Sequence, residues 1–191
     1  HYQNRFDELL RNSIAPNNEV VLTHASNFRK VKRVDDVVRI FNLVKQQIPA
    51  KLLLIGDGPE RPRIEQLCRK LNMCDDINFL GKSKAIEKLM AISDLFLLPS
   101  EAESFGLVAL EAMAAGVPVV SSNVGGLSEV NKEGVTGFLS EVGDIDEMAA
   151  NALKILEGDL NTFKKNARNH SQYFDLPNIL PQYESLYESM I

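Results

Sequence analysis

Residues 95–122 read LFLLPSEAESFGLVALEAMAAGVPVVSS, and this stretch decides the fold. A continuous apolar run, Leu95–Leu98, is followed by a polar loop, a helix-length segment, Leu107–Ala115, and a second apolar run, Val117–Ser121. Short apolar runs without polar alternation are typical of strands that are buried on both faces. A strand, a crossover helix and a second strand predict a parallel βαβ unit.

The same alternation continues through most of the chain. Further apolar runs lie at Val20–Ala25, Lys51–Gly56, Ile77–Leu80 and Gly137–Leu139. Helix-length segments lie between the runs, at Val34–Gln47, Glu60–Leu71, Ala85–Ala91 and Leu127–Lys132. This order predicts an α/β fold, a doubly wound, Rossmann-like parallel sheet of about six strands. After Gly143 the pattern is helical only, at roughly Asp144–Glu157, Leu160–Phe174 and Ile179–Met190.

Composition bounds the class of protein. The 191 residues are 45% hydrophobic and 25% charged, which is typical of a globular chain. A net charge of −5 argues against general nucleic-acid binding. Two cysteines, Cys68 and Cys74, make no disulfide scaffold, and neither a membrane-length apolar run nor a signal peptide is found, so a cytoplasmic location is expected.

Residues 99–116, PSEAESFGLVALEAMAAG, contain a loop followed by a helix whose N-terminus would form an anion site. The backbone amides of Gly106, Leu107 and Val108 would be free at the helix N-terminus, where phosphates bind readily. From 107 to 115 only Glu111 is charged, so the helix is expected to be buried. A buried carboxylate needs a donor, which either a protein group or a ligand hydroxyl could provide.

Three other patterns are less informative. The Gly56-x-Gly58 pair begins a dinucleotide fingerprint, but Arg61 stands where the third glycine is expected. Asp144-Ile-Asp146 could be a metal-binding D-x-D, although an N-cap with Glu147 three residues after Asp144 is favoured. The histidines are scattered and indicate no metal site, and His24, in an apolar run, is interpreted as a core histidine.

Several elements together resemble the retaining glycosyltransferases of family 4, which have the two-domain GT-B fold. Glu103 and Glu111 are separated by seven residues, as in the E-x7-E element of that family. The resemblance also includes five shorter elements in the same order: residues 56–60 (GDGPE), 79–81 (FLG), 116–120 (GVPVV), 125–129 (GGLSE) and 134–137 (GVTG). It covers nearly the whole chain and implies the carboxyl-terminal domain, which binds the nucleotide-sugar donor.

The resemblance implies a role for each matching position. Lys32 would neutralise the diphosphate and Glu103 would bind the donor sugar, and these two are the expected catalytic residues. The expected donor-binding residues are Glu111 at the ribose, Lys82 and Ser83 at the uracil, and Gly106, Leu107 and Val108 at the diphosphate. Ser104 and Phe105 are also expected to bind the donor. Asn27 stands where many members have an arginine, and Arg29 or Arg33 would replace that cation. These two arginines, with Lys30 and Lys32, form a cationic segment that predicts either an anion site or a solvated turn.

The loop at 26–36, SNFRKVKRVDD, is similar to that of members which transfer N-acetylglucosamine from UDP-N-acetylglucosamine to L-malate in bacillithiol synthesis. This similarity implies a UDP-sugar donor as substrate, with no cofactor or metal required. Two alternatives remain open. One is a member that uses UDP-glucose or a GDP-sugar and another acceptor, and the other is a non-catalytic nucleotide-binding module.

The domain organisation follows from the same resemblance. We expect an interdomain link with a short helix at 1–18, the nucleotide-sugar-binding domain at 19–174 and an amphipathic helix at 175–191 that packs on an absent amino-terminal domain. The acceptor would bind to that absent domain, so the chain alone is expected to bind nucleotide but to turn over poorly. The last helix has an apolar face, which would favour a homo-oligomer; the face comprises Ile179, Leu180, Tyr183, Leu186, Tyr187 and Met190.

Overall fold

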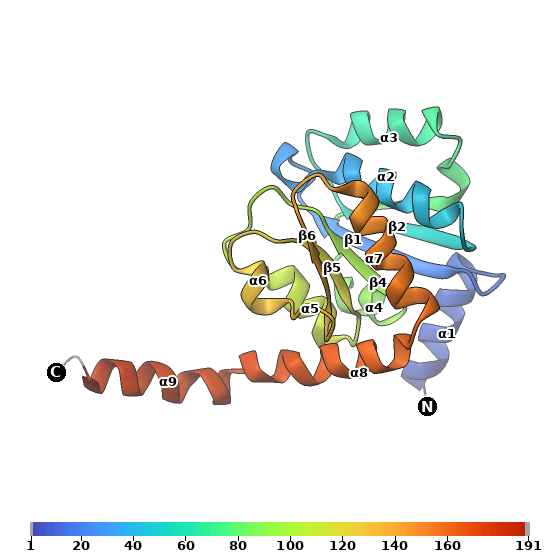
Figure 1. Cartoon of the computed structure of the whole chain (residues 1–191). Helices are drawn as coiled ribbons and strands as arrows, with labels where there is room; N and C mark the ends of the chain where they lie inside the picture. Colours follow the sequence, from blue (N-terminus) through green and yellow to red (C-terminus); the bar gives the residue numbers. More distant parts are fainter. Residues whose placement is uncertain (1, 190–191) are drawn as a thin grey trace.

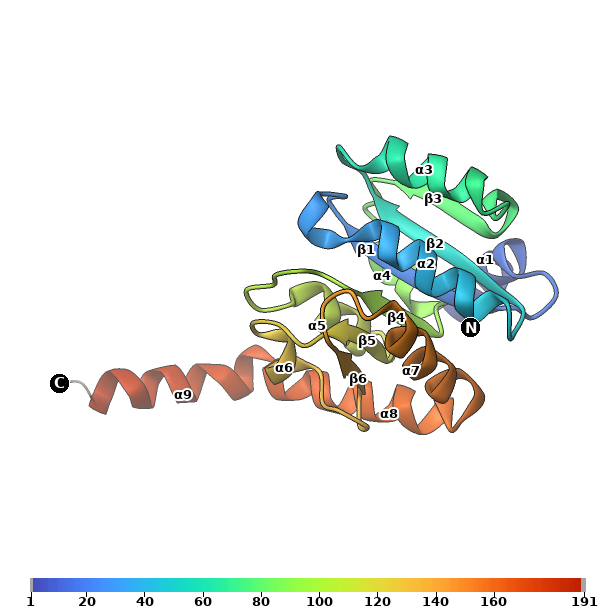
Figure 2. The ribbon, with the colours of Figure 1, turned by 45° about the horizontal axis from the view of Figure 1, so that its top comes forward.

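The computed structural model describes the backbone of residues 2–189, and the side chains of residues 7–182 and 184–189. Six parallel strands form one sheet in the order β3-β2-β1-β4-β5-β6 (Figures 1 and 2). The strands are β1 Val20–Ser26, β2 Ala50–Gly56, β3 Ile77–Gly81, β4 Leu95–Leu98, β5 Val119–Ser122 and β6 Gly137–Ser140. The predicted doubly wound, Rossmann-like fold is therefore confirmed.

Helices connect the strands and follow the last one. The α-helices are α1 Tyr2–Ile14, α2 Val34–Lys45, α3 Arg61–Lys70, α4 Ile86–Ala91, α5 Leu107–Ala114, α6 Leu127–Val130, α7 Ile145–Glu157, α8 Leu160–Ser171 and α9 Leu176–Ser189. Three short 3-10 helices are η1 Lys30–Lys32, η2 Cys74–Asp76 and η3 Gln172–Phe174.

The element ends differ from the sequence prediction at two prolines. The strand expected from Val117 begins at Val119, because Gly116 has a positive φ of 81° and Pro118 has no N–H to donate. The last helix begins at Leu176 rather than Ile179, since Pro177 lies in its first turn, where a missing N–H costs nothing.

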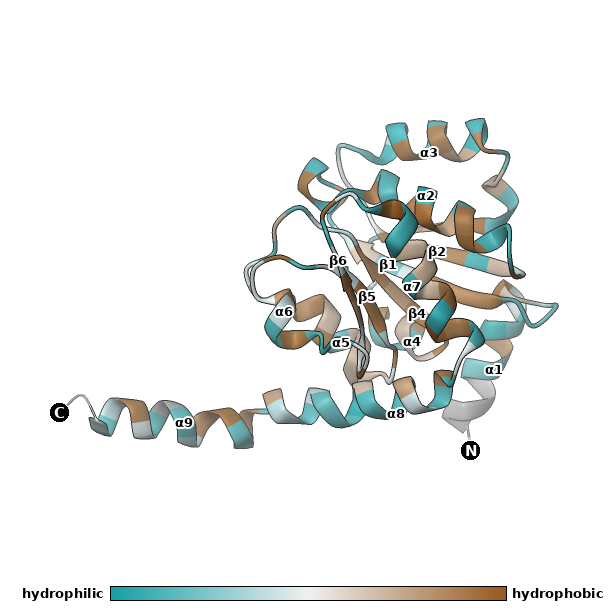
Figure 3. Ribbon diagram, in the orientation of Figure 1, coloured by the Kyte–Doolittle hydropathy of each residue, from teal (hydrophilic) through white to brown (hydrophobic). Residues whose placement is uncertain are grey.

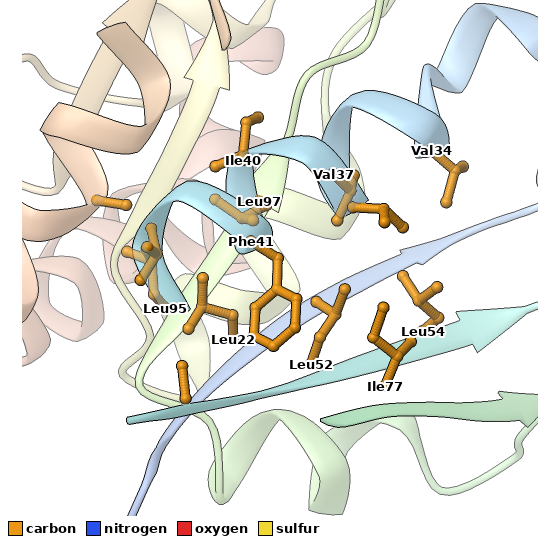
Figure 4. Close-up of a cluster of buried hydrophobic side chains, with 14 of the residues drawn as sticks. Leu22, Val34, Val37, Ile40, Phe41, Leu52, Leu54, Ile77, Leu95 and Leu97 are labelled. Atoms are coloured by element: carbon orange, nitrogen blue, oxygen red, sulfur yellow. The ribbon is translucent and has the colours of Figure 1, made fainter. Parts of the chain in front are cut away.

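The two faces of the sheet are covered by different helices. Helices α2, α3 and α7 pack on one face, where Phe41 and Val37 of α2 lie against Leu22 and Leu52 (Figure 4). Helices α4, α5 and α8 cover the other face, and α1 packs on it through a smaller cluster around Val21 and Leu53. Figure 3 shows the apolar strands between helices whose outer surfaces are hydrophilic.

Asp94, immediately before β4, connects helices α1 and α8 to the sheet. Its buried carboxylate accepts from Arg11 of α1 at 2.6 Å, from Lys164 of α8 at 2.7 Å and from the Val21 N–H at 3.0 Å. Burial alone would raise the pKa of Asp94, but Lys164, the Val21 N–H and Arg11 together hold it below its usual value.

Helix α9 extends away from the body of the protein (Figure 1). Leu176 is 72% exposed, Leu180 48%, Leu186 55% and Tyr187 66%, whereas Ile179 is half-buried. Two members of the expected stripe, the Tyr183 side chain and Met190, lie outside the described residues. No helix in the described part of the chain is long and apolar enough to cross a membrane.

Candidate functional site

A cleft of about 590 Å³ lies at the carboxyl ends of β1 and β2, beside the start of α5. Strand order reverses between β1 and β4, and doubly wound sheets bind their ligands at this switch point. The cleft is lined by Ala25, Ser26, Asn27, Lys32, Ile55, Gly56, Asp57, Lys82, Ser83, Ile86, Glu103, Ser104, Phe105, Gly106, Leu107 and Val108.

Most of the site residues expected from the sequence meet in this cleft. They come from three separate loops and from the first turn of α5, and they are Asn27, Lys32, Lys82, Ser83, Glu103, Ser104, Phe105, Gly106, Leu107 and Val108. Arg29, Arg33 and Glu111 are not among the lining residues. The roles assigned to all of these residues remain predictions.

The start of α5 presents free backbone donors to the cleft. Gly106 has a φ of 90°, and a Cβ there would lie 2.5 Å from Leu127 Cδ2, so both the conformation and the space require glycine. The first helical hydrogen bond runs from the Ala109 N–H to the Gly106 carbonyl at 2.9 Å. The amides of Gly106, Leu107 and Val108 precede it and can therefore bind an anion.

Lys32 and Glu103 form an ion pair inside the cleft. Their side chains are 21% and 12% exposed, and the Ser100 hydroxyl donates to Glu103 Oε1 at 3.2 Å. The Glu101 N–H donates to the Val31 carbonyl at 2.8 Å, which holds η1 against the loop that carries Glu103. The two groups expected to bind different parts of the donor thus neutralise each other.

A second recess of about 460 Å³ shares Lys32, Glu103 and Ser104 with the cleft. Its other lining residues are Glu101, Ala102, Val124 and Gly125. Gly125 allows the loop after β5 to approach closely, since a Cβ there would lie 1.9 Å from the Glu103 carbonyl oxygen. The Lys32–Glu103 pair lies where the two spaces adjoin.

The two arginines proposed to replace the family cation lie elsewhere. The Arg33 guanidinium binds the buried Asp36 carboxylate of α2 at 2.5 Å. Burial raises the pKa of Asp36, and the bond to Arg33 partly opposes that increase. Arg29 is exposed and does not line the cleft. The cationic segment therefore contributes only Lys32 to the cleft.

The expectation that α5 is buried all round is wrong. Glu111 is exposed and Leu107 is 67% exposed, whereas Ala109, Ala112 and Met113 are buried. One side of the helix packs on the core, and the other side begins at the cleft. Glu111 lies one turn after Leu107 on that open side. It needs no buried donor, and a ligand in the cleft could reach it only along this surface.

His24 lies beneath the cleft floor as the core histidine that the sequence predicts. Its side chain is fully buried, with Nδ1 2.8 Å from the Leu97 carbonyl oxygen and Nε2 2.8 Å from Ser26 Oγ. Burial lowers the pKa of His24 to about 4. The ring is therefore neutral at pH 7.

Six lining residues were not among the expected site residues: Ala25, Ser26, Ile55, Gly56, Asp57 and Ile86. Ser26 and Asp57 directly follow apolar runs, so the general rule for strand ends could have found them. Asp144 is the expected N-cap, because its Oδ1 accepts from the Glu147 N–H at 2.9 Å. No cluster of potential metal ligands occurs among the described residues.

Comparisons with known proteins show which family the chain is similar to. The family described as glycosyl transferases group 1 matches residues 6–170. The N-acetyl-alpha-D-glucosaminyl L-malate synthase of Bacillus anthracis is 46% identical over 176 residues, which are 91% of this chain and 46% of that protein. The 2-deoxystreptamine N-acetyl-D-glucosaminyltransferase of Niallia circulans is 33% identical over 73% of this chain and 37% of its own length.

Among solved structures, the Anabaena protein HepE in complex with UDP superposes with a TM-score of 0.85 and 30% identity. The match covers 96% of this chain and 52% of HepE. The chain therefore spans about half, or less, of the length of these relatives.

Proposed function

Because the chain belongs to the group 1 family of glycosyl transferases, we propose that it is the donor-binding domain of a retaining hexosyltransferase which transfers N-acetylglucosamine from UDP-N-acetylglucosamine to L-malate. The observation that carries this proposal is the 46% identity to the N-acetyl-alpha-D-glucosaminyl L-malate synthase of Bacillus anthracis over 91% of the chain. The cleft supports it, because its donors match a nucleoside diphosphate.

The cleft residues divide between the parts of such a donor. The amides of Gly106, Leu107 and Val108 and the Lys32 ammonium would hold the diphosphate. When the bond between sugar and phosphate breaks, these groups would stabilise the negative charge that develops on the leaving UDP. Asn27, which also lines the cleft, would be a neutral donor to the phosphates.

The nucleoside and the transferred sugar occupy opposite ends of the diphosphate in this proposal. Lys82 and Ser83 would lie beside the uracil, and Glu111 would bind the ribose hydroxyls along the open side of α5. Glu103 would accept hydrogen bonds from hydroxyls of the transferred sugar, where the cleft adjoins the second recess. Ser104 and Phe105 complete the wall between these positions.

We also propose the division of the chain that this function requires. Residues 19–174 would be the nucleotide-sugar domain, residues 1–18 a link with a short helix, and residues 175–191 a helix that packs on a further domain. The acceptor would bind on that domain, which corresponds to the part of the Bacillus anthracis relative that this chain does not span. The chain alone would then bind the donor and show little transfer.

Calorimetric titration with UDP and UDP-N-acetylglucosamine tests the proposal. We expect saturable binding to the wild type, and a loss of about ten- to a hundredfold in affinity for Lys32→Ala and Glu111→Ala, since each removes a charge-assisted contact. Arg69→Ala is the matched control, because Arg69 is an exposed cation of α3 far from the cleft. Wild-type protein that binds neither ligand, or variants that bind as well as wild type, would contradict the proposal.

One observation favours a second donor, because HepE is also solved with UDP-glucose at 30% identity to this chain. Titration with UDP-glucose, GDP-mannose and ADP-glucose in parallel decides between the donors. Tighter binding of UDP-glucose than of UDP-N-acetylglucosamine would replace the proposed sugar and retain the site. Transfer to malate by the 191-residue chain would contradict the proposed division into domains.

A further inference from the structure

We propose that His24 is a positioning residue of the nucleotide site, whose imidazole orients the Ser26 hydroxyl and thereby fixes the turn that carries Asn27 into the cleft. The inference rests on the proposed function for its ligand. His24 itself does not line the cleft, so it would act through Ser26.

The hydrogen bonds determine which atom carries each proton. The Leu97 carbonyl oxygen can only accept, so His24 Nδ1 carries the hydrogen. The ring is neutral at pH 7, so Nε2 has no hydrogen and accepts from the Ser26 hydroxyl at 2.8 Å. Ser26 Oγ has then used its only proton, and its lone pairs are free to accept from the Phe28 N–H at 3.3 Å.

This last bond closes a serine turn at the end of β1. Phe28 has a φ of 35°, a conformation that a phenylalanine adopts only when its surroundings hold it there. Two contacts hold Phe28 in this conformation. Its ring stacks on His24 with centroids 6.3 Å apart, and its backbone carbonyl accepts from the Glu60 N–H at 3.0 Å. His24 also stacks on Phe96, so the ring is fixed between two aromatic side chains.

The position of Asn27 follows from this turn. Asn27 lies between Ser26 and Phe28, and its carbonyl oxygen leaves no room for a Cβ on Gly58, where the separation would be 2.1 Å. The turn is therefore packed against the loop after β2, and Asn27 lines the cleft. Without an acceptor at Nε2, the Ser26 hydroxyl could rotate and the turn would lose one of its supports.

Two substitutions at His24 separate this role from core packing. His24→Gln places an amide oxygen near the former Nε2, which can still accept a hydrogen bond from the Ser26 hydroxyl. His24→Asn keeps a donor near Nδ1 for the Leu97 carbonyl but has no acceptor for the Ser26 hydroxyl. Both remove the ring and its stacking, so both destabilise the fold. Ser26→Ala removes the hydroxyl without touching the core. Thr23→Val is the control, since it breaks the buried Thr23–Ser93 bond of 2.5 Å on the same strand.

We expect His24→Asn and Ser26→Ala to weaken UDP binding about five- to tenfold. His24→Gln loses the stacking but keeps an acceptor for Ser26, so it should weaken binding less than His24→Asn, and Thr23→Val should leave binding within about twofold of wild type. The double variant His24→Asn/Ser26→Ala should lose less affinity than the two single losses combined, because both substitutions remove the same His24–Ser26 bond. Equal losses for His24→Asn and His24→Gln, or additive losses in the double variant, would overturn the proposal.

Hydrogen exchange of the Phe28 amide makes the test independent of the ligand. We expect faster exchange in His24→Asn and Ser26→Ala than in His24→Gln and Thr23→Val, measured at matched global stability. A wild type that fails to bind UDP would contradict the proposed function, and the exchange rates would still decide the role of His24. Exchange at Phe28 that is the same in all four variants would reject that role.

Discussion

At the scale of single residues, the ion pair between Lys32 and Glu103 has a consequence for affinity. A diphosphate must compete with the Glu103 carboxylate for Lys32, and the same carboxylate repels the phosphates. Glu103→Gln should therefore raise the affinity for UDP by about three- to tenfold, although it removes a group proposed for the sugar. Calorimetry with UDP, which lacks the transferred sugar, isolates this effect. Glu101→Gln, on the same loop, is the charge-matched control, and weaker UDP binding by Glu103→Gln would show that the pair does not compete with the ligand.

His24 makes stability depend on pH. Its pKa of about 4 in the folded protein is below the ordinary value of 6.5, so the unfolded state binds more protons between these values. The stabilisation is complete above pH 6.5 and is lost as the pH falls towards 4, by about 3 kcal/mol at most. Urea unfolding at pH 7 and at pH 4.5 should show a smaller drop in His24→Gln than in wild type. Equal drops would mean that His24 is not neutral in the folded protein.

At the scale of elements, Asp94 joins α1, β1 and α8 through one buried carboxylate. Asp94→Asn would leave Lys164 and Arg11, which are partly exposed, without their charge partner, and the loss of hydrogen bonds to a charged group costs about 1.5–3 kcal/mol. The midpoint of urea unfolding should fall accordingly. Asp75→Asn, an exposed acid of η2, should leave it unchanged. A loss below 1 kcal/mol in Asp94→Asn would mean that the helices are held by their apolar contacts alone.

The elements themselves could be predicted because their periodicity is local. Leu95–Leu98 is apolar throughout, and the strand occupies exactly the positions of that run. The exposure of α5 could not be predicted, because Leu107 faces the open cleft rather than the core, and composition does not distinguish these environments. The contact between Lys32 and Glu103 joins residues 71 positions apart, so only the folded sheet brings them together. For the same reason the sequence could not show that Arg33 is bound to Asp36.

At the scale of the whole molecule, the sheet places loops from both halves of the chain at one edge. The cleft combines Ser26 and Gly56, which end β1 and β2, with the start of α5, and the strand order brings them together. Helix α9 exposes most of the apolar side chains that the structure describes on it, namely Leu176, Leu180, Leu186 and Tyr187. Its exposed leucines and tyrosine are therefore available to another surface.

We expect this surface to make the chain self-associate, because burying exposed leucines against a second copy removes apolar area from water. The sedimentation coefficient should rise with protein concentration, and Leu180→Gln/Leu186→Gln should reduce that rise. Glu188→Gln, on the same helix, should leave it unchanged, because Glu188 is exposed and polar. A strictly monomeric profile at high concentration would mean that α9 does not pair with a second copy. Association that persists in the leucine variant would place the contact elsewhere on the molecule.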